Sequence, residues 1–170
     1  HRLFSLLNSI WAIPAVIIMR LIRPWRMIRI GQLFAGRIGH FVPDALEHFL
    51  RAEIASKRTL DFFYFFGGVS NSQWANMVSR NLKVKGKWLQ YIWHWNVFLP
   101  GGKAHTLPQS FTQSRDIEGL MELSKERFEF LEIENEVCEQ WLKSKGWRHG
   151  EPFICLQVRD SLYLSEFDTA

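Results

Sequence analysis

Three polar residues that could bind an anion close an apolar run near the end of the chain. Residues 153–158 have the length of a buried strand, and Gln157, Arg159 and Asp160 lie at its end. Ligands of α/β proteins bind at the carboxyl ends of such strands. Alternation places Gln157 and Arg159 on one face, where the arginine fork suits a diphosphate or a carboxylate. Asp160 would orient Arg159 or bind a sugar hydroxyl; the alternative is a structural Arg–Asp pair.

A second group of candidate ligand-binding residues lies in the segment 32–40, before a predicted helix. Arg37, Gly39 and His40 occur there within the sequence R-I-G-H. Glycine lets a backbone approach a ligand closely, and a helix N-terminus offers N–H groups to a phosphate. The spacing matches neither the dinucleotide fingerprint G-x-G-x-x-G nor a Walker loop. A strand-to-helix turn without a ligand is therefore the alternative.

Several other reactive side chains lack the neighbours that metal or redox chemistry requires. His94, His105 and His149 have no carboxylate or cysteine at metal-ligand spacing, so we expect no metal ion, and nothing in the sequence calls for a bound cofactor. Cys138 and Cys155 lie far apart in the sequence, one in a helical pattern and one in a strand pattern. They predict buried free thiols in a reduced compartment.

The net charge of +4 is unevenly distributed along the chain. Residues 3–19 contain no charged side chain, and arginines alternate with large apolar residues over 20–29. This pattern is typical of a membrane interface, whereas Pro14 would kink a helix. Three alternatives follow: a helix lying in the interface, a spanning helix, or a buried helix of a soluble domain. No nucleic-acid recognition motif accompanies the basic residues, so we expect a membrane surface as partner and no nucleic acid.

Strands and helices alternate along the body of the chain. Apolar runs predict strands at residues 27–31 and 59–66. Helical spacing predicts one helix from Pro43 to residue 54 and another from Asn71 or Ser72 to residue 78. Asp44 and Glu47 would stabilise the N-terminus of the first of these helices. The alternation predicts an α/β fold with a parallel sheet and crossover helices.

Two further helices are predicted in the second half of the chain. A helix at residues 88–98 would end before Pro100, and its aromatic face would be buried or would form a groove for an acceptor or a lipid. That face comprises Trp88, Tyr91, Ile92, Trp95 and Phe98. A long helix at residues 117–145 would bury one apolar side and expose its many glutamates. That side comprises Leu120, Leu123, Leu131, Val137, Cys138 and Trp141.

Together these segments resemble a family of bacterial glycosyltransferases of surface-carbohydrate biosynthesis. The resemblance covers residues 13–164 and is strongest at R-I-G-H and at the late strand I-C-L-x-V-R-D-S-x-Y-L. In that family the strand reads C-L-H-V-R-D, which is similar to the H-x-R element of fucosyltransferase-like enzymes with two Rossmann-like domains (GT-B). Gln157 replaces the family's histidine here, and glutamine cannot exchange a proton near neutral pH.

The resemblance implies a glycosyltransferase that moves a sugar from a nucleotide-sugar donor to a surface glycan or a lipid-linked acceptor. Arg159 would contact the donor phosphates with Asp160 and Gln157 in support. Gly39 and His40 would line the cleft between the two domains from the first domain. Arg37 and Gly39 would help to bind the donor phosphates, and His40 is the candidate catalytic base.

The same resemblance implies a domain organisation and a location. A membrane-associating segment at residues 1–25 would precede a Rossmann-like domain at 26–150, and residues 151–170 would begin a second domain. We expect the chain to be the front part of a longer protein at the cytoplasmic face of the bacterial inner membrane, inactive in sugar transfer alone. The alternatives are a non-catalytic membrane-anchoring or scaffold module and a soluble nucleotide-binding domain.

Overall fold

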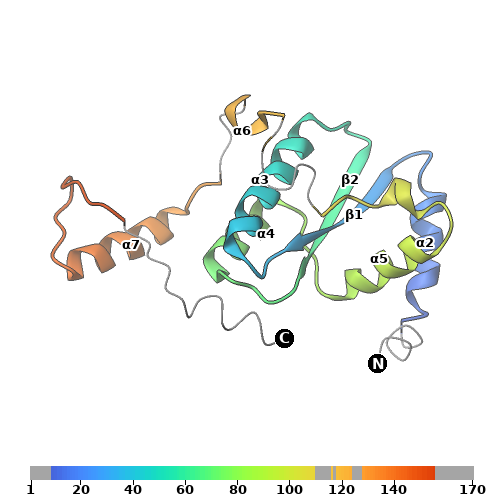
Figure 1. Ribbon diagram of the computed structural model, residues 1–170, viewed down its shortest axis with the longest axis horizontal. Coiled ribbons are helices and arrows are strands. Elements are labelled where there is room, and N and C mark those ends of the chain that lie inside the picture. Colours follow the sequence, from blue (N-terminus) through green and yellow to red (C-terminus); the bar gives the residue numbers. More distant parts are fainter. Residues whose placement is uncertain (1–8, 110–115, 117, 124–127, 156–170) are drawn as a thin grey trace. The chain divides into compact units, whose positions relative to one another are not determined.

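The computed structural model describes residues 9–109, 116, 118–123 and 128–155 (Figure 1). The chain forms two compact units, His1–Glu129 and Phe130–Ala170. The first unit contains a parallel sheet with helices on both faces, and the second contains a single described helix.

Two parallel strands form the sheet of the first unit. β1 (Met27–Phe34) pairs with β2 (Thr59–Phe66), with Met27 opposite Thr59 and Phe34 opposite Phe66. Single parallel bridges extend the sheet on both sides, because Thr106 pairs with Ile30 of β1 and Val84 pairs with Phe63 of β2. The order across the sheet is therefore Val84, β2, β1, Thr106. The predicted strand at residues 59–66 and the mixed α/β class with crossover helices are confirmed.

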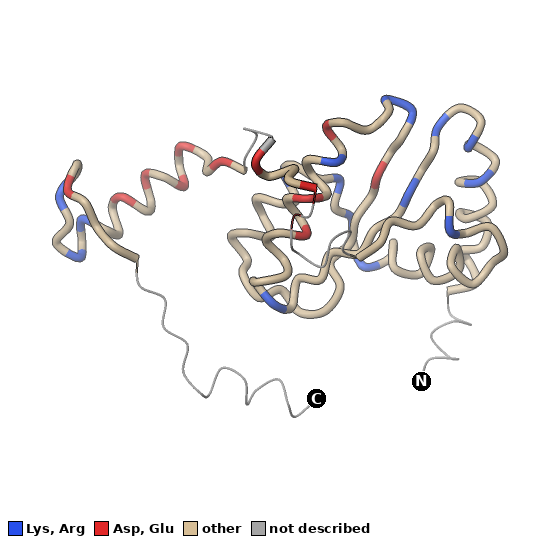
Figure 2. The backbone as a smooth tube through the Cα atoms, turned by 45° about the horizontal axis from the view of Figure 1, so that its top comes forward, with Lys and Arg blue, Asp and Glu red and all other residues tan. Residues whose placement is uncertain are grey.

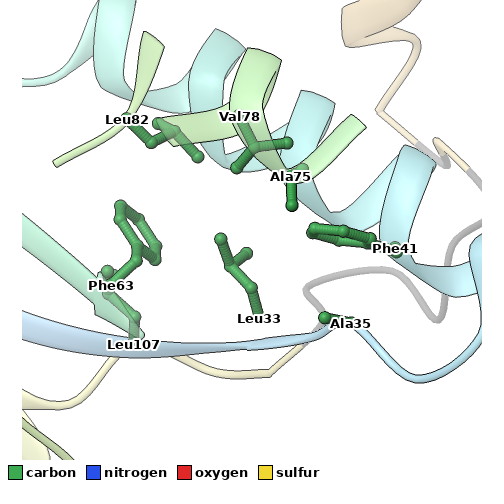
Figure 3. Close-up of a cluster of buried hydrophobic side chains, with 9 residues drawn as sticks. Leu33, Ala35, Phe41, Phe63, Ala75, Val78, Leu82 and Leu107 are labelled. Atoms are coloured by element: carbon green, nitrogen blue, oxygen red, sulfur yellow. The ribbon is translucent and has the colours of Figure 1, made fainter. Parts of the chain in front are cut away.

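One face of the sheet packs against helices α3 (Ile38–Ile54) and α4 (Ser72–Asn81). Leu33 of β1 and Phe63 of β2 point into this cluster, where Val78 and Ala75 of α4 lie above them (Figure 3). The side chains in the cluster are mostly fully buried, so this face forms one of the two hydrophobic cores. The members are Leu33, Ala35, Phe41, Ala45, Phe63, Ala75, Val78, Leu82 and Leu107.

The opposite face of the sheet packs against helices α2 (Ala12–Leu21) and α5 (Trp88–Phe98) (Figure 1). Ile30 and Tyr64 from the strands are buried there with Val16 of α2 and Ile92 of α5. The alternation of side chains along each strand explains why residues 30 and 33 enter different cores. Helices thus cover both faces of the sheet, as expected for parallel strands.

The boundary between β1 and α3 differs from the prediction. The predicted strand at residues 27–31 and the predicted helix start at Pro43 leave a connecting segment between them, but β1 continues to Phe34 and α3 begins at Ile38. β1 extends to Phe34 because each of its residues is paired with β2. Pro43 is the sixth residue of α3, not its first. Gly31 lies inside the strand, and glycine fits there because a Cβ would come within 2.8 Å of Cε1 of Phe63.

Helix α5 has the predicted limits but buries a different face. Leu89, Ile92 and Asn96 are its buried residues, whereas Trp88 and Phe98 are 48% and 75% exposed. The prediction of a buried aromatic face is therefore wrong for Trp88 and Phe98. It is confirmed only for Ile92, which is buried, and in part for Trp95, which is half-buried against the core. The helix is oriented by its contact with α2 and the sheet, which the aromatic spacing alone does not reveal.

The predicted long helix at residues 117–145 is also wrong. The structure has two helices in its place, α6 (Leu120–Leu123) and α7 (Glu132–Ser144). The Asp116 carboxylate accepts hydrogen bonds from the first amides of α6, and Leu131 adopts an extended conformation before α7. The backbone N–H of Leu131 donates to the Glu134 carboxylate, which starts a new helix there.

The second unit exposes the groups that the sequence predicted to be buried. Helix α7 buries none of its described residues, and Trp141 is 61% exposed. Cys138 and Cys155 are both exposed free cysteines, so the prediction of buried thiols is wrong. Residues 153–155 are not in a strand, and the remainder of that predicted strand lies outside the described residues.

Part of the apolar segment at residues 3–19 is buried in the hydrophobic core. Helix α2 has ten residues, and Ala12, Val16 and Met19 are buried against α5 and the sheet. Pro14 is third in the helix, where the first turn lacks intrahelical N–H bonds in any case. Within the described part of the chain, no helix is both long enough and apolar enough to cross a bilayer.

Candidate functional site

The carboxyl ends of β1 and β2 meet at one edge of the sheet. The amide of Ala35 donates to the carbonyl of Phe66 at 3.1 Å, and the amide of Ser70 donates to the carbonyl of Ala35 at 2.9 Å. Gly67 adopts a φ of 81°, a left-handed conformation that turns the chain after β2. These bonds fix the two strand ends side by side and place the N-termini of α3 and α4 at the same edge.

The predicted residues Arg37, Gly39 and His40 lie together in the first turn of α3. Arg37 is the residue before the helix, with an extended backbone and no side-chain hydrogen bond that caps the helix. All three residues are exposed, and a Cβ added at Gly39 would meet no atom within 4 Å. The ring of His40 lies 6.3 Å from the ring of Phe34 at the end of β1. A ligand could therefore approach the backbone of this turn directly.

The N-terminus of α4 at the same edge is closed by its own chain. The side chain of Asn71 accepts a hydrogen bond from the amide of Trp74 at 2.8 Å, which is the predicted cap. The indole N–H of Trp74 donates to the carbonyl of Phe41 in α3 at 3.4 Å. Of the two helix N-termini, the one at α3 is consequently the more open to an anion.

The course of the chain reverses beside β1. From β1 the chain passes through α3 to β2, and then through α4 on the same face to Val84 at the outer side of β2. It then passes through α5 on the other face and returns to Thr106, on the side of β1 away from β2. Ligands of open α/β sheets bind at the carboxyl ends of the strands where the order reverses. Arg37 and His40 follow β1 directly, which places them at this position.

Arg159, Asp160 and Gln157 lie outside the described residues. Their approach to the turn at Arg37 and His40 stays a prediction. The structure thus brings together the three early candidates and leaves the three late ones untested. In the part that the structure describes, no group of His, Cys, Asp and Glu side chains gathers as a metal ion would need.

Sequence reasoning missed a polar cluster at the opposite end of the strands. Arg29 of β1 and Asp61 of β2 are directly opposite each other, and two hydrogen bonds of 2.7 Å join them. His48 of α3 is 3% exposed and packs 4.8 Å from the ring of Phe63. Burial, with the nearby positive charges of Arg29 and Arg51, lowers the pKa of His48 to about 4. The neutral imidazole is therefore favoured.

The carboxylates of α3 belong to this inner region. Asp44 and Glu47, expected at the helix start, lie seventh and tenth in α3 and are buried. Arg51 forms ion pairs with Glu47 at 3.2 Å and with Glu118 at 3.0 Å. Arg51 is thus paired with two carboxylates. Together with Arg29, His48 and Asp61 it lines a cavity of about 180 Å³. We interpret this polar cluster as one that stabilises the packing of α3 on the sheet. The helical spacing of residues 44, 47, 48 and 51 was the signal in the sequence that could have revealed it.

Comparisons with known proteins add no family to this picture. No family model, curated protein or solved structure matches the chain.

Proposed function

We propose that this chain is the amino-terminal, Rossmann-like part of a two-domain (GT-B) glycosyltransferase that works at a membrane surface. The observation that carries the proposal is the reversal of the chain beside β1, with Arg37, Gly39 and His40 in an open helix turn at that position. Nucleotides and other phosphate ligands bind at such positions in open α/β sheets. The resemblance at R-I-G-H and at the late strand supplies the reaction class.

Each proposed site residue has a distinct role. Arg37 binds phosphate oxygens of the substrate, and Gly39 lets them approach the amides of α3. Arg159, held by Asp160 with Gln157 beside it, stabilises the diphosphate that leaves the anomeric carbon. His40 accepts the proton of the attacking acceptor hydroxyl. The proposal assigns no metal ion or cofactor to these steps, and the nucleotide sugar is a substrate.

The membrane part of the proposal is supported by the exposed side of α2. Ile17, Ile18 and Leu21 are 50%, 56% and 67% exposed, and Trp25 follows them at 72%. Arg23 and Arg26 flank this tryptophan, a combination suited to a headgroup layer. We place the protein at the cytoplasmic face of the bacterial inner membrane, with a surface glycan or a lipid-linked sugar as acceptor. The same observation favours a second candidate, a non-catalytic membrane-binding module.

Titration of the chain with UDP-, GDP-, dTDP- and CMP-linked sugars tests the enzyme proposal. We expect one nucleotide sugar to bind and Arg37→Ala to weaken it at least tenfold, because a hydrogen bond to a charged group contributes about 1.5–3 kcal/mol and about 1.4 kcal/mol is tenfold. Lys83→Ala is the matched control, since Lys83 is exposed and lies beside the middle of β2, next to the bridge between Val84 and Phe63.

Two outcomes would contradict the proposal. Equal effects of Arg37→Ala and Lys83→Ala would remove Arg37 from the site. Absence of any nucleotide-sugar binding by a chain that still binds liposomes would favour the non-catalytic module.

A further inference from the structure

An apolar cavity lies between α2, the sheet and α5. It has a volume of about 300 Å³, at the lower end of the range for small-molecule pockets, which is roughly 300–1,000 Å³. Ile18 and Ile22 line it from α2 and its C-terminal end, Phe62 from β2 and Trp88 from α5. Among the described residues that line it, Lys85 alone carries a charge, and its ammonium lies 6.0 Å from the centre of the Phe62 ring. The interior therefore suits a hydrocarbon group.

A basic hollow lies at the turn that joins α2 to β1. Pro24, Trp25, Arg26, Lys57 and Arg58 line a space of about 440 Å³, and none of them is acidic. Arg26 donates to the carbonyl of Lys57 at 2.7 Å, and Arg58 donates to the carbonyl of Pro24. These bonds hold both guanidinium groups against backbone carbonyls around the same exposed space. Positive charges that share such a space repel each other unless an anion is present.

One short stretch of chain, residues 22–28, lines both the apolar cavity and the basic hollow. Ile22 and Ile28 line the apolar cavity, and residues 24–26 between them line the basic hollow. Within the first unit, Lys and Arg gather at the C-terminal end of α2, on this turn and on the loop before β2 (Figure 2). No acidic residue precedes Asp44 in the sequence. A cavity for a hydrocarbon group and a hollow for an anion are thus adjacent.

We propose that this region binds one molecule of an anionic membrane phospholipid. One acyl chain enters the apolar cavity, and Arg26, Lys57 and Arg58 hold the phosphate. The charge of the hollow selects an anionic head group, and the exposed Trp25 and Ile18 lie at the boundary of headgroups and acyl chains. This proposal deepens the membrane part of the proposed function and does not depend on sugar transfer.

Titration with a single-chain lipid separates insertion of the chain from adsorption to a surface. The 170-residue chain is titrated with lysophosphatidylglycerol below its micelle concentration, with lysophosphatidylcholine, and with glycerol phosphate, which has no acyl chain. We expect the anionic lysolipid to bind at least tenfold more tightly than either comparison ligand. A brominated acyl chain should quench tryptophan fluorescence, and Trp88→Phe should reduce that quenching because Trp88 lines the cavity.

Three variants locate the site. Ala15 lines the cavity, so Ala15→Phe should fill it and weaken lysolipid binding at least tenfold. Ile18→Glu places a carboxylate at an exposed lining position and should do the same without disturbing the core. Arg58→Ala should weaken binding and reduce its salt dependence. Lys83→Ala and Arg37→Ala serve as controls and should leave lysolipid binding unchanged.

The outcomes distinguish this proposal from its rivals and from the enzyme proposal. Unchanged lysolipid affinity in Ile18→Glu and Ala15→Phe, with native circular dichroism, would overturn it. Equal binding of the two lysolipids would remove the role of the basic hollow. A concentration-dependent dimer that Ile18→Glu converts to a monomer, without lipid binding, would assign the cavity to a second copy. Nucleotide-sugar binding should be unaffected by Ile18→Glu, so either proposal can fail alone.

Discussion

Arg20 provides the most direct test of how α2 is attached to the rest of the protein. Its guanidinium donates to the carbonyls of Pro100, Asn96 and Leu99 at 2.6, 3.0 and 3.2 Å, and to the side-chain oxygen of Asn96 at 3.1 Å. The acceptors include the last carbonyls of α5, which have no intrahelical donors. The sequence placed Arg20 in a basic membrane segment, but the structure uses it to cap α5.

We expect Arg20→Met to lower the free energy of unfolding by about 2–3 kcal/mol. Methionine keeps most of the aliphatic contact but leaves the side-chain oxygen of Asn96, which is fully buried, without this donor. An acceptor left unsatisfied in this way costs about 1–3 kcal/mol. Loss of a positive charge at a helix C-terminus costs about 0.3–1 kcal/mol more.

Urea unfolding monitored by tryptophan fluorescence measures this loss, and Arg23→Met is the control. Arg23 is exposed one turn further on, so its substitution should change stability by no more than about 0.5 kcal/mol. Arg20→Met and Asn96→Ala should together cost less than the sum of the single changes, because they remove the same contact. Equal stability of the two arginine variants would refute the capping role and return Arg20 to the membrane interface.

Three further predictions concern the inner polar cluster and the glycines beside α5. Because His48 has a pKa of about 4 when folded and about 6.5 when unfolded, the unfolded state binds more protons between these values. The contribution of neutral His48 to the free energy of unfolding is present above pH 6.5 and falls by about 2 kcal/mol from pH 7 to pH 5. The free energy of unfolding of His48→Phe, measured against pH, should lack this decrease. The same decrease in the variant would contradict the lowered pKa of His48. Asp61→Asn breaks the ion pair between Arg29 and Asp61 and should lower the free energy of unfolding in urea by about 1–3 kcal/mol. An unchanged free energy of unfolding would show that this ion pair does not stabilise the sheet. A Cβ at Gly102 would overlap the Asn96 carbonyl oxygen, whereas a Cβ at Gly101 would meet no atom within 4 Å, although the φ of Gly101 is 82°. Thermal unfolding should therefore show that Gly102→Ala lowers the free energy of unfolding by about 3 kcal/mol or more. Gly101→Ala should lower it by only about 1–2 kcal/mol.

Part of the candidate site could be predicted because it depends on local chain direction. A strand followed closely by a helix brings Arg37 and His40 to the end of β1 whatever the rest of the chain does. The openness of that turn was not predictable, since it depends on which neighbouring side chains cover it. Arg29 and Asp61 were missed for a similar reason: they become partners only when the register of β1 and β2 is known.

The sequence by itself determined the elements whose signals are local. The limits of β2 follow from an apolar run that ends at two glycines, the start of α4 from the Asn71 cap, and the end of α5 from Pro100 and Gly101. Each of these signals acts through a residue's own backbone preferences or through a hydrogen bond within one turn. Such interactions are encoded within a few positions and can be identified without knowledge of the fold.

Only the tertiary structure decided which faces are buried and which charges are paired. Helix α5 buries Leu89 and Asn96 instead of its aromatic stripe because α2 and the sheet pack against that side. Arg20, eighty positions from Pro100 in sequence, caps α5 for the same reason. Burial and pairing are properties of surfaces brought together from distant parts of the chain, so a pattern within one segment cannot specify its partner.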